Sequence, residues 1–120
     1  MADRDLCCSI APYFEVKDEN LAAFKALCNQ CVEQSEKEPG CLYYGFSFSD
    51  GAVHCREGYQ DANALLTHVG NIDPLLQQML QISTVTRLEV HGPESELAKL
   101  REPLKDTHAK FFVLETGFRR

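Results

Sequence analysis

The sequence has no long hydrophobic run and no excess of positive charge. None of its apolar stretches approaches the roughly 20 residues that a membrane-spanning helix needs. The first residues, 1–5, carry mixed charge, where a signal peptide would be basic and then apolar. The formal net charge is −6, which argues against binding to nucleic acid or to an anionic membrane. We therefore expect a cytoplasmic protein that has neither kind of partner.

The chain also lacks room for a second domain, and it lacks linkers, repeats and low-complexity segments. A chain of 120 residues can build one modest hydrophobic core. Its 44% of hydrophobic and 25% of charged residues are typical of an ordinary globular protein. We expect a single domain over residues 1–120, with a core of about residues 6–91 and a C-terminal extension of about residues 92–120.

Six cysteines are present, and in a reducing compartment we expect free thiols and no disulfide framework. Cys28 and Cys31 form a CxxC pattern, but they lie in the middle of an expected helix and on its apolar side. This pattern has neither the strand-to-helix position of a thioredoxin motif nor the second pair of a zinc site. Cys7 and Cys8 fall on opposite faces of an expected strand, so together they cannot chelate one metal. The sequence predicts no metal site.

Hydrophobic periodicity predicts strands that alternate with helices. Apolar runs and period-two alternation predict five strands, at about residues 6–14, 41–48, 52–59, 84–91 and 109–118. Apolar residues at helical spacing predict helices at about residues 19–37, 61–79 and 94–103.

Glycine and proline mark the expected boundaries. Pro12 predicts an unpaired or bulged position in the first strand. Gly40 is expected in the left-handed conformation that ends a helix, and Gly51 in a tight hairpin turn. Gly70 is expected to break the second long helix, which would restart at Pro74, because proline is tolerated in a first helical turn.

The order of elements predicts an α+β fold. The first six elements, β-α-β-β-α-β, are those of a ferredoxin-like sandwich with helices on one face of the sheet, and a further helix and strand follow. The strand at 41–48 is apolar or aromatic on both faces: one carries Leu42, Tyr44, Phe46 and Phe48, and the other Cys41, Tyr43, Gly45 and Ser47. Since the helices cover only one face, we expect the other to pack on a second copy of the chain about a two-fold axis.

Three short motifs connect these elements to a known family: Glu38-Pro39-Gly40-Cys41, Glu57-Gly58-Tyr59-Gln60-Asp61 and His68, nine residues after Tyr59. Over about residues 6–91 they resemble the antibiotic biosynthesis monooxygenase (ABM) superfamily, whose pattern has one residue between the glutamate and the proline of the first motif. The resemblance implies a homodimeric α+β barrel with a pocket between the sheet and the helices of each subunit. Better understood members oxidise quinol-like aromatic rings with dioxygen and no cofactor, or degrade haem.

The chain contains no Trp, which haem-degrading members carry at about the place of His68. The first strand also has no Asn at the catalytic place. The resemblance therefore implies a monooxygenase that needs no cofactor and acts on a small aromatic, quinol- or phenol-like substrate. The alternative is a non-catalytic dimeric barrel that binds an unknown ligand or acts in a stress response.

His68 is the candidate catalytic residue, because an imidazole that titrates near neutrality can take a proton from a phenol or quinol. Alternatively, His68 bonds a backbone group or the Glu57 carboxylate and positions the helix. The candidate substrate-binding residues are Tyr43, Tyr44, Arg56, Glu57 and Tyr59, although strand tyrosines also belong to cores, and Arg56 can equally lie on a solvated or interface face. A pocket of a few hundred Å³ lined by His68 and a tyrosine would favour the enzyme, and a filled core the binding protein.

Overall fold

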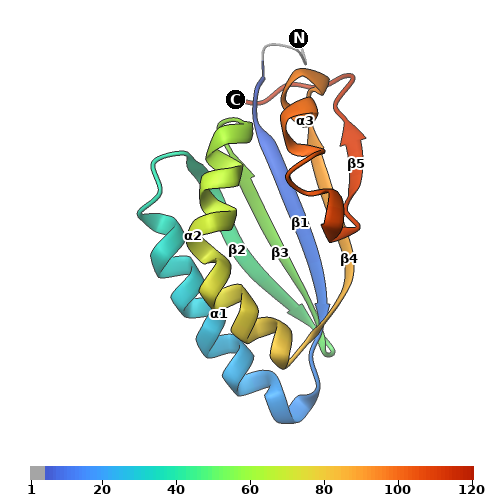
Figure 1. Cartoon of the computed structure of the whole chain (residues 1–120). Coiled ribbons are helices and arrows are strands. Elements are labelled where there is room, and N and C mark those ends of the chain that lie inside the picture. The colour runs from blue at the N-terminus through green and yellow to red at the C-terminus, as the bar shows by residue number, and fades with distance from the viewer. Residues whose placement is uncertain (1–4) are drawn as a thin grey trace.

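The computed structural model describes residues 5–120. In this part of the chain, helices cover one face of a five-stranded sheet, and the predicted order of strands and helices is confirmed (Figure 1). The elements are β1 (Cys8–Glu15), a 3-10 turn (Asp18–Asn20), α1 (Leu21–Glu36), β2 (Cys41–Ser49), β3 (Ala52–Tyr59), α2 (Ala62–Gln81), β4 (Thr84–Gly92), α3 (Glu94–Leu100), a second 3-10 turn (Lys105–Thr107) and β5 (Lys110–Val113).

The strand order is β2-β3-β1-β4-β5. The first four strands pair antiparallel in the ferredoxin-like arrangement, and β5 adds to the edge parallel to β4. A parallel neighbour requires a crossover connection, and α3 provides it. The α+β fold class predicted from the sequence is thus confirmed for the described residues.

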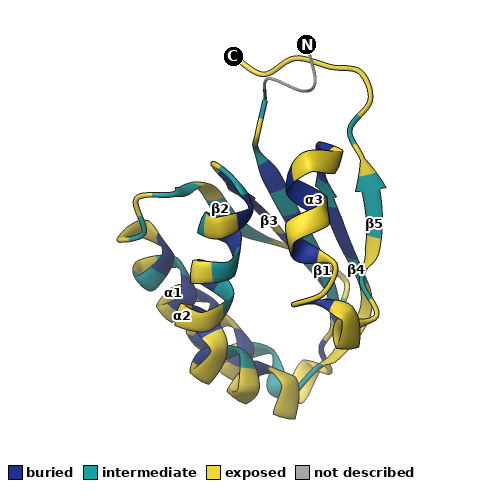
Figure 2. Ribbon diagram, turned by 45° about the horizontal axis from the view of Figure 1, so that its top comes forward, coloured by how far each residue is buried: buried dark blue, intermediate teal, exposed yellow. Residues whose placement is uncertain are grey.

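The core lies between the sheet and the helices, in two clusters. One cluster joins α1 and the far half of α2 to the sheet and includes Phe14, Phe24 and Met79. The other joins the start of α2 and α3 to the sheet and includes Tyr59 and Leu97. Each large apolar side chain buried in this way contributes about 1.5–3 kcal/mol. Figure 2 shows that the buried parts of the helices are those turned toward the sheet.

Helix α2 is continuous, so the predicted break at Gly70 is wrong. Asp61 caps it by accepting a hydrogen bond from the Ala64 N–H at 2.8 Å. Ile72 and Met79, which follow Gly70, are both buried against the sheet. A glycine inside a helix lowers its stability by only about 1 kcal/mol. Burial of Ile72 and Met79 stabilises the continuous helix by more than that. Within residues 5–120, no helix has the combination of length and hydrophobicity that a membrane crossing requires.

Gly40 has a different role from the one expected. The described glycines with positive φ are Gly51 and Gly117, so the left-handed conformation predicted for Gly40 is wrong, while that for Gly51 is confirmed. A Cβ atom on Gly40 would lie 2.5 Å from the Cβ of Ala64. Glycine is needed here because the turn before β2 packs directly on the first turn of α2.

Two irregularities decide which side chains face the helices. The pairing of β1 with β4 shifts register between Tyr13 and Phe14, next to Pro12, which agrees with the expected bulge. The pairing of β2 with β3 shifts between Cys41 and Tyr43. Cys41 therefore packs on the cluster under the helices, whereas simple alternation had placed it on the same face as Tyr43. Beyond the shift the predicted alternation holds, and Tyr44 and Phe46 are on the side that packs under the helices.

Candidate functional site

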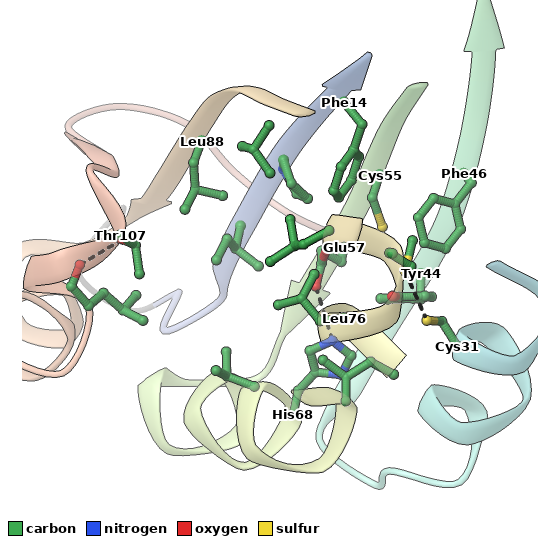
Figure 3. A pocket seen from close by; sticks show the side chains of 18 residues that line it. Phe14, Cys31, Tyr44, Phe46, Cys55, Glu57, His68, Leu76, Leu88 and Thr107 are labelled. Atoms are coloured by element: carbon green, nitrogen blue, oxygen red, sulfur yellow. Dashed lines mark hydrogen bonds and ion pairs between the residues drawn. The ribbon is translucent and has the colours of Figure 1, made fainter. Parts of the chain in front are cut away.

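An apolar pocket of about 290 Å³ lies between the sheet and α2 (Figure 3). Most of its lining consists of aliphatic and aromatic side chains from β1, β4 and α2. Polar groups come from Tyr44 on β2, Glu57 on β3, His68 on α2 and Thr107 in the C-terminal part of the chain. A mostly apolar cavity with a few converging polar groups is the usual form of a small-molecule site.

His68 forms part of one wall of this pocket and is held on both sides by carboxyl groups. Only 3% of the residue is exposed. Its Nδ1 lies 3.0 Å from Oε1 of Glu38, and its Nε2 lies 3.3 Å from Oε1 of Glu57. Figure 3 shows the contact between His68 and Glu57 at the pocket. These two contacts fix the orientation of the imidazole ring.

Glu57 is a buried carboxyl group with an unusual proton affinity. The Tyr59 hydroxyl donates a hydrogen bond to Oε1 of Glu57 at 2.5 Å. Burial raises the pKa of Glu57 to about 7, against the opposing effect of that hydrogen bond. Near neutral pH the carboxyl group can therefore either hold or release a proton, as a general acid or base must.

The proton distribution in the pair follows from burial. Desolvation lowers the pKa of His68, although the Glu38 carboxylate opposes this. Both shifts favour a neutral imidazole beside a protonated Glu57. With Glu38 accepting from the Nδ1–H, Nε2 is left to accept from Glu57. The Asn71 side chain donates to Oε2 of Glu38 at 2.8 Å and so helps to hold Glu38 in place.

Three of the residues predicted from the sequence line the pocket: Tyr44, Glu57 and His68. The Tyr44 ring centroid lies 5.2 Å from that of His68. Tyr59 lies behind Glu57, fully buried, with its ring centroid 4.9 Å from that of His68. The structure therefore brings four of the predicted residues together, with Tyr59 supporting the other three.

The other two predicted residues, Tyr43 and Arg56, lie on the opposite face of the sheet. The Arg56 guanidinium is 5.4 Å from the centroid of the Tyr43 ring. That ring covers Gly58, where an added Cβ would come within 2.3 Å of it. Neither side chain is among those that line the pocket.

Glu38 is the site residue that sequence reasoning missed. In the sequence it stands out only as part of the turn motif, and its contact with His68 joins positions 30 residues apart. The motif itself was the available signal, because a glutamate beside a tightly packed turn has a fixed position.

The cysteines are unpaired thiols, and all six lie within residues 5–120. Cys28 and Cys31 are buried in the core, as the sequence predicted, and Cys31 also reaches the pocket wall. Burial raises the pKa of Cys28 to about 12 and that of Cys31 to about 11, so both remain protonated at neutral pH. Among the described residues, no group of His, Cys, Asp and Glu is arranged to hold a metal ion.

Comparison with known proteins finds a matching family model and a relative that matches over nearly the full length. The model of the family described as antibiotic biosynthesis monooxygenase matches residues 9–71. The crystal structure of MupZ from Pseudomonas fluorescens superposes with a TM-score of 0.91 at 49% identity. That match covers 95% of this chain and 94% of MupZ.

More distant structures share the fold. SnoaB from Streptomyces nogalater, a cofactor-independent oxygenase, has a TM-score of 0.63 at 13% identity, over 71% of this chain and 90% of SnoaB. Rv0793 from Mycobacterium tuberculosis has a TM-score of 0.64 at 22% identity, over 72% of this chain and 94% of that protein. A search of curated proteins finds no significant match. The family match over more than half of the chain shows that this protein belongs to the antibiotic biosynthesis monooxygenase family.

Proposed function

We propose that this protein is a cofactor-independent monooxygenase that oxidises a small aromatic, quinol- or phenol-like substrate in the pocket beside His68. The observation that carries the proposal is the pocket itself, an apolar cavity of about 290 Å³ with His68 and Tyr44 in its lining. A cavity of this size, lined by His68 and a tyrosine, favours an enzyme over a binding protein with a filled core. Family membership supports the reaction class, and the fold shared with SnoaB agrees with it.

Glu57 would take the proton of a substrate hydroxyl while its own proton passes to Nε2 of His68, and the Glu38 carboxylate beside Nδ1 would stabilise the imidazolium that forms. In an apolar pocket the resulting phenolate is poorly solvated and gives up electrons to dioxygen more readily than in water. Dioxygen then bonds to a ring carbon that carries hydrogen. When the O–O bond breaks, one oxygen stays on that carbon as a carbonyl, and the other leaves as water with two hydrogens from the substrate. The substrate supplies all the electrons, so the reaction needs no cofactor.

Replacing His68 by Ala tests this function. We expect oxygen uptake with a panel of anthrols and quinols to fall by about 10²-fold or more, the usual contribution of a general acid or base. An oxygen electrode measures uptake without added metal or flavin, and sedimentation shows whether the oligomeric state is kept. His108→Asn is the control, because His108 is exposed, lies outside the pocket and has a positive φ that asparagine tolerates.

Unchanged uptake in the His68 variant would remove His68 from the mechanism. If the wild-type protein consumes no oxygen with any member of the panel, the monooxygenase proposal is wrong.

A second candidate is a proton-transfer reaction that needs no dioxygen, such as an isomerisation or the addition or loss of water. The observation that favours it is Glu57, a buried carboxyl group whose pKa of about 7 suits a general acid. Substrate conversion under anaerobic conditions, with the same dependence on Glu57 and His68, would identify this activity. Conversion only in the presence of dioxygen would exclude it.

We further propose that the protein acts as a homodimer in the cytoplasm, where its free thiols would persist. The helices leave one face of the sheet uncovered (Figure 1). On that face, the rings of Tyr13 and His54 stack with centroids 4.4 Å apart. The Nδ1 atom of His54 is buried but has no hydrogen-bond partner among residues 5–120. Such a group is costly, and a second copy packed on this face could supply the partner.

A further inference from the structure

The C-terminal segment, residues 93–113, lies outside the part of the chain that the family model matches. The match with MupZ covers 95% of the chain and so includes most of this segment. The matches with SnoaB and Rv0793, at 71% and 72%, leave more than a quarter of the chain uncovered. The β-α-β-β-α-β elements of the ferredoxin-like fold end with β4, so this segment is an addition to them, and the match with MupZ includes most of it.

This segment is firmly attached to the sheet. Leu97 and Leu100 of α3 are fully buried in the second core cluster. After α3, strand β5 pairs with β4 through four residues. Between these two anchors, the chain turns so that Leu104 and Thr107 line the pocket. The Thr107 hydroxyl donates to the Leu104 carbonyl at 2.6 Å, which closes the turn on itself.

The pocket runs across the sheet toward this turn. Its lining includes Tyr44 on β2, Glu57 on β3, Ile10 on β1 and Leu88 on β4, and it ends at Leu104. Neighbouring strands are spaced by about 4.8 Å, so the distance from β2 to β4 is about 14 Å. In Figure 3, Phe46 and Thr107 lie at opposite sides of the pocket.

The two ends of the pocket differ in chemistry. The end over β2 and β3 holds the ionisable pair of Glu57 and His68 and the hydroxyl of Tyr44. The end over β1 and β4 is formed by Ile10, Leu88 and other apolar side chains. Leu104, which is only 5% exposed, lies at its limit beside Thr107, whose hydroxyl already donates to the Leu104 carbonyl. A ligand with one polar end would therefore bind in a single orientation, with its apolar part toward the C-terminal segment.

We propose that the C-terminal segment closes the apolar end of the pocket, and that Leu104 is a specificity-determining residue that sets the length of the apolar part of the substrate. The substrate class is then a phenol or quinol that carries an apolar substituent. This inference rests on the proposed function for the identity of the polar end, which lies at Glu57 and His68. The length limit itself depends only on binding.

The test is a series of n-alkylhydroquinones of increasing chain length, titrated calorimetrically under anaerobic conditions so that no oxidation occurs. With the wild-type protein, affinity should rise by about fourfold for each methylene buried, equivalent to about 0.8 kcal/mol, until the chain reaches Leu104. Leu104→Ala should extend this limit by at least one methylene, and Leu104→Phe should shorten it. Leu104→Val, a milder truncation, is measured as well in case Leu104→Ala unfolds.

Leu100→Ala is the matched control. It also removes a buried leucine from the C-terminal segment, but Leu100 does not line the pocket, so the limit should stay where it is in the wild type. An identical limit in the wild-type protein and in every Leu104 variant overturns the inference, as does the absence of saturable binding by any member of the series. A length limit that moves with Leu104, without oxygen uptake in air, would support the inference and refute the monooxygenase.

Discussion

At the scale of single residues, the site depends on where one proton lies between Glu57 and His68. Both side chains are buried, and each would lose solvation if it became charged. The Glu38 carboxylate accepts a hydrogen bond from the Nδ1–H of His68, which partly offsets the lost solvation of the ring. This contact leaves Nε2, on the other side of the ring, directed at Glu57. The pair can thus receive or deliver a proton at the pocket without admitting water to it.

The raised pKa of Glu57 predicts how stability changes with pH. In the unfolded chain this carboxyl group titrates near 4.5, and in the folded protein near 7. The protonated form is therefore favoured by folding, and its stabilising contribution is complete below pH 4.5 and lost as the pH rises through 7. As the pH rises from 4.5 to 8, the wild type should therefore lose up to about 3 kcal/mol of its free energy of unfolding relative to Glu57→Gln, whose side chain does not titrate. Urea unfolding across this range measures the difference.

Glu36→Gln is the control for this prediction, because it makes the same chemical change at an exposed position of α1. Its stability relative to the wild type should not vary with pH in the same way. A Glu57→Gln variant that keeps a constant offset from the wild type at every pH would show that Glu57 titrates normally in the folded protein.

At the scale of elements, the turn between α1 and β2 places Glu38. Gly40 in this turn lies against Ala64 on α2, with space for no Cβ atom. We expect Gly40→Ala to lower the free energy of unfolding by about 1–3 kcal/mol, the usual cost of overpacking, and to move Glu38 away from Nδ1 of His68. Denaturant unfolding measures the first effect, and the ¹⁵N chemical shifts of the His68 ring report the second.

Gly70→Ala provides the contrast. A Cβ at Gly70 would meet nothing within 4 Å, and the residue lies inside the continuous helix α2. The same substitution should therefore raise the free energy of unfolding there, by up to about 1 kcal/mol. If Gly40→Ala proves as stable as the wild type and leaves the His68 resonances unchanged, the tight contact with Ala64 does not position Glu38.

These elements also show what the sequence could predict. The order of strands and helices was readable because apolar spacing and turn residues are local signals. The break expected at Gly70 was wrong because burial of α2 on the sheet outweighs a local preference. The contact of Glu38 with His68 joins positions 30 residues apart, so local spacing could not predict it. The pairing of His68 with Glu57 is one of the alternatives that the sequence predicts for this histidine, and the structure confirms it.

At the scale of the whole molecule, none of the helices within residues 5–120 covers the second face of the sheet (Figure 1). Its side chains, as the structure shows, are a mixture of aromatic and charged residues rather than a continuous apolar surface. Arg56 beside Tyr43 is one such pair, and His91 stacked on Phe112 with centroids 4.7 Å apart is another. A second copy would have to match these aromatic and charged groups, as the polar parts of protein interfaces do.

The homodimer can be tested at Gly45 on β2, which pairs with the outward-facing Arg56 and has nothing within 4 Å of an added Cβ. The wild-type protein should sediment with twice the protomer mass of 13.5 kDa at micromolar concentration. Gly45→Arg should give the single protomer, because it places a second cation beside Arg56 between sheets that pack only about 10 Å apart. Gly70→Arg adds the same charge on exposed α2 and should remain dimeric. If the wild-type protein sediments as a single protomer, the proposed homodimer is wrong.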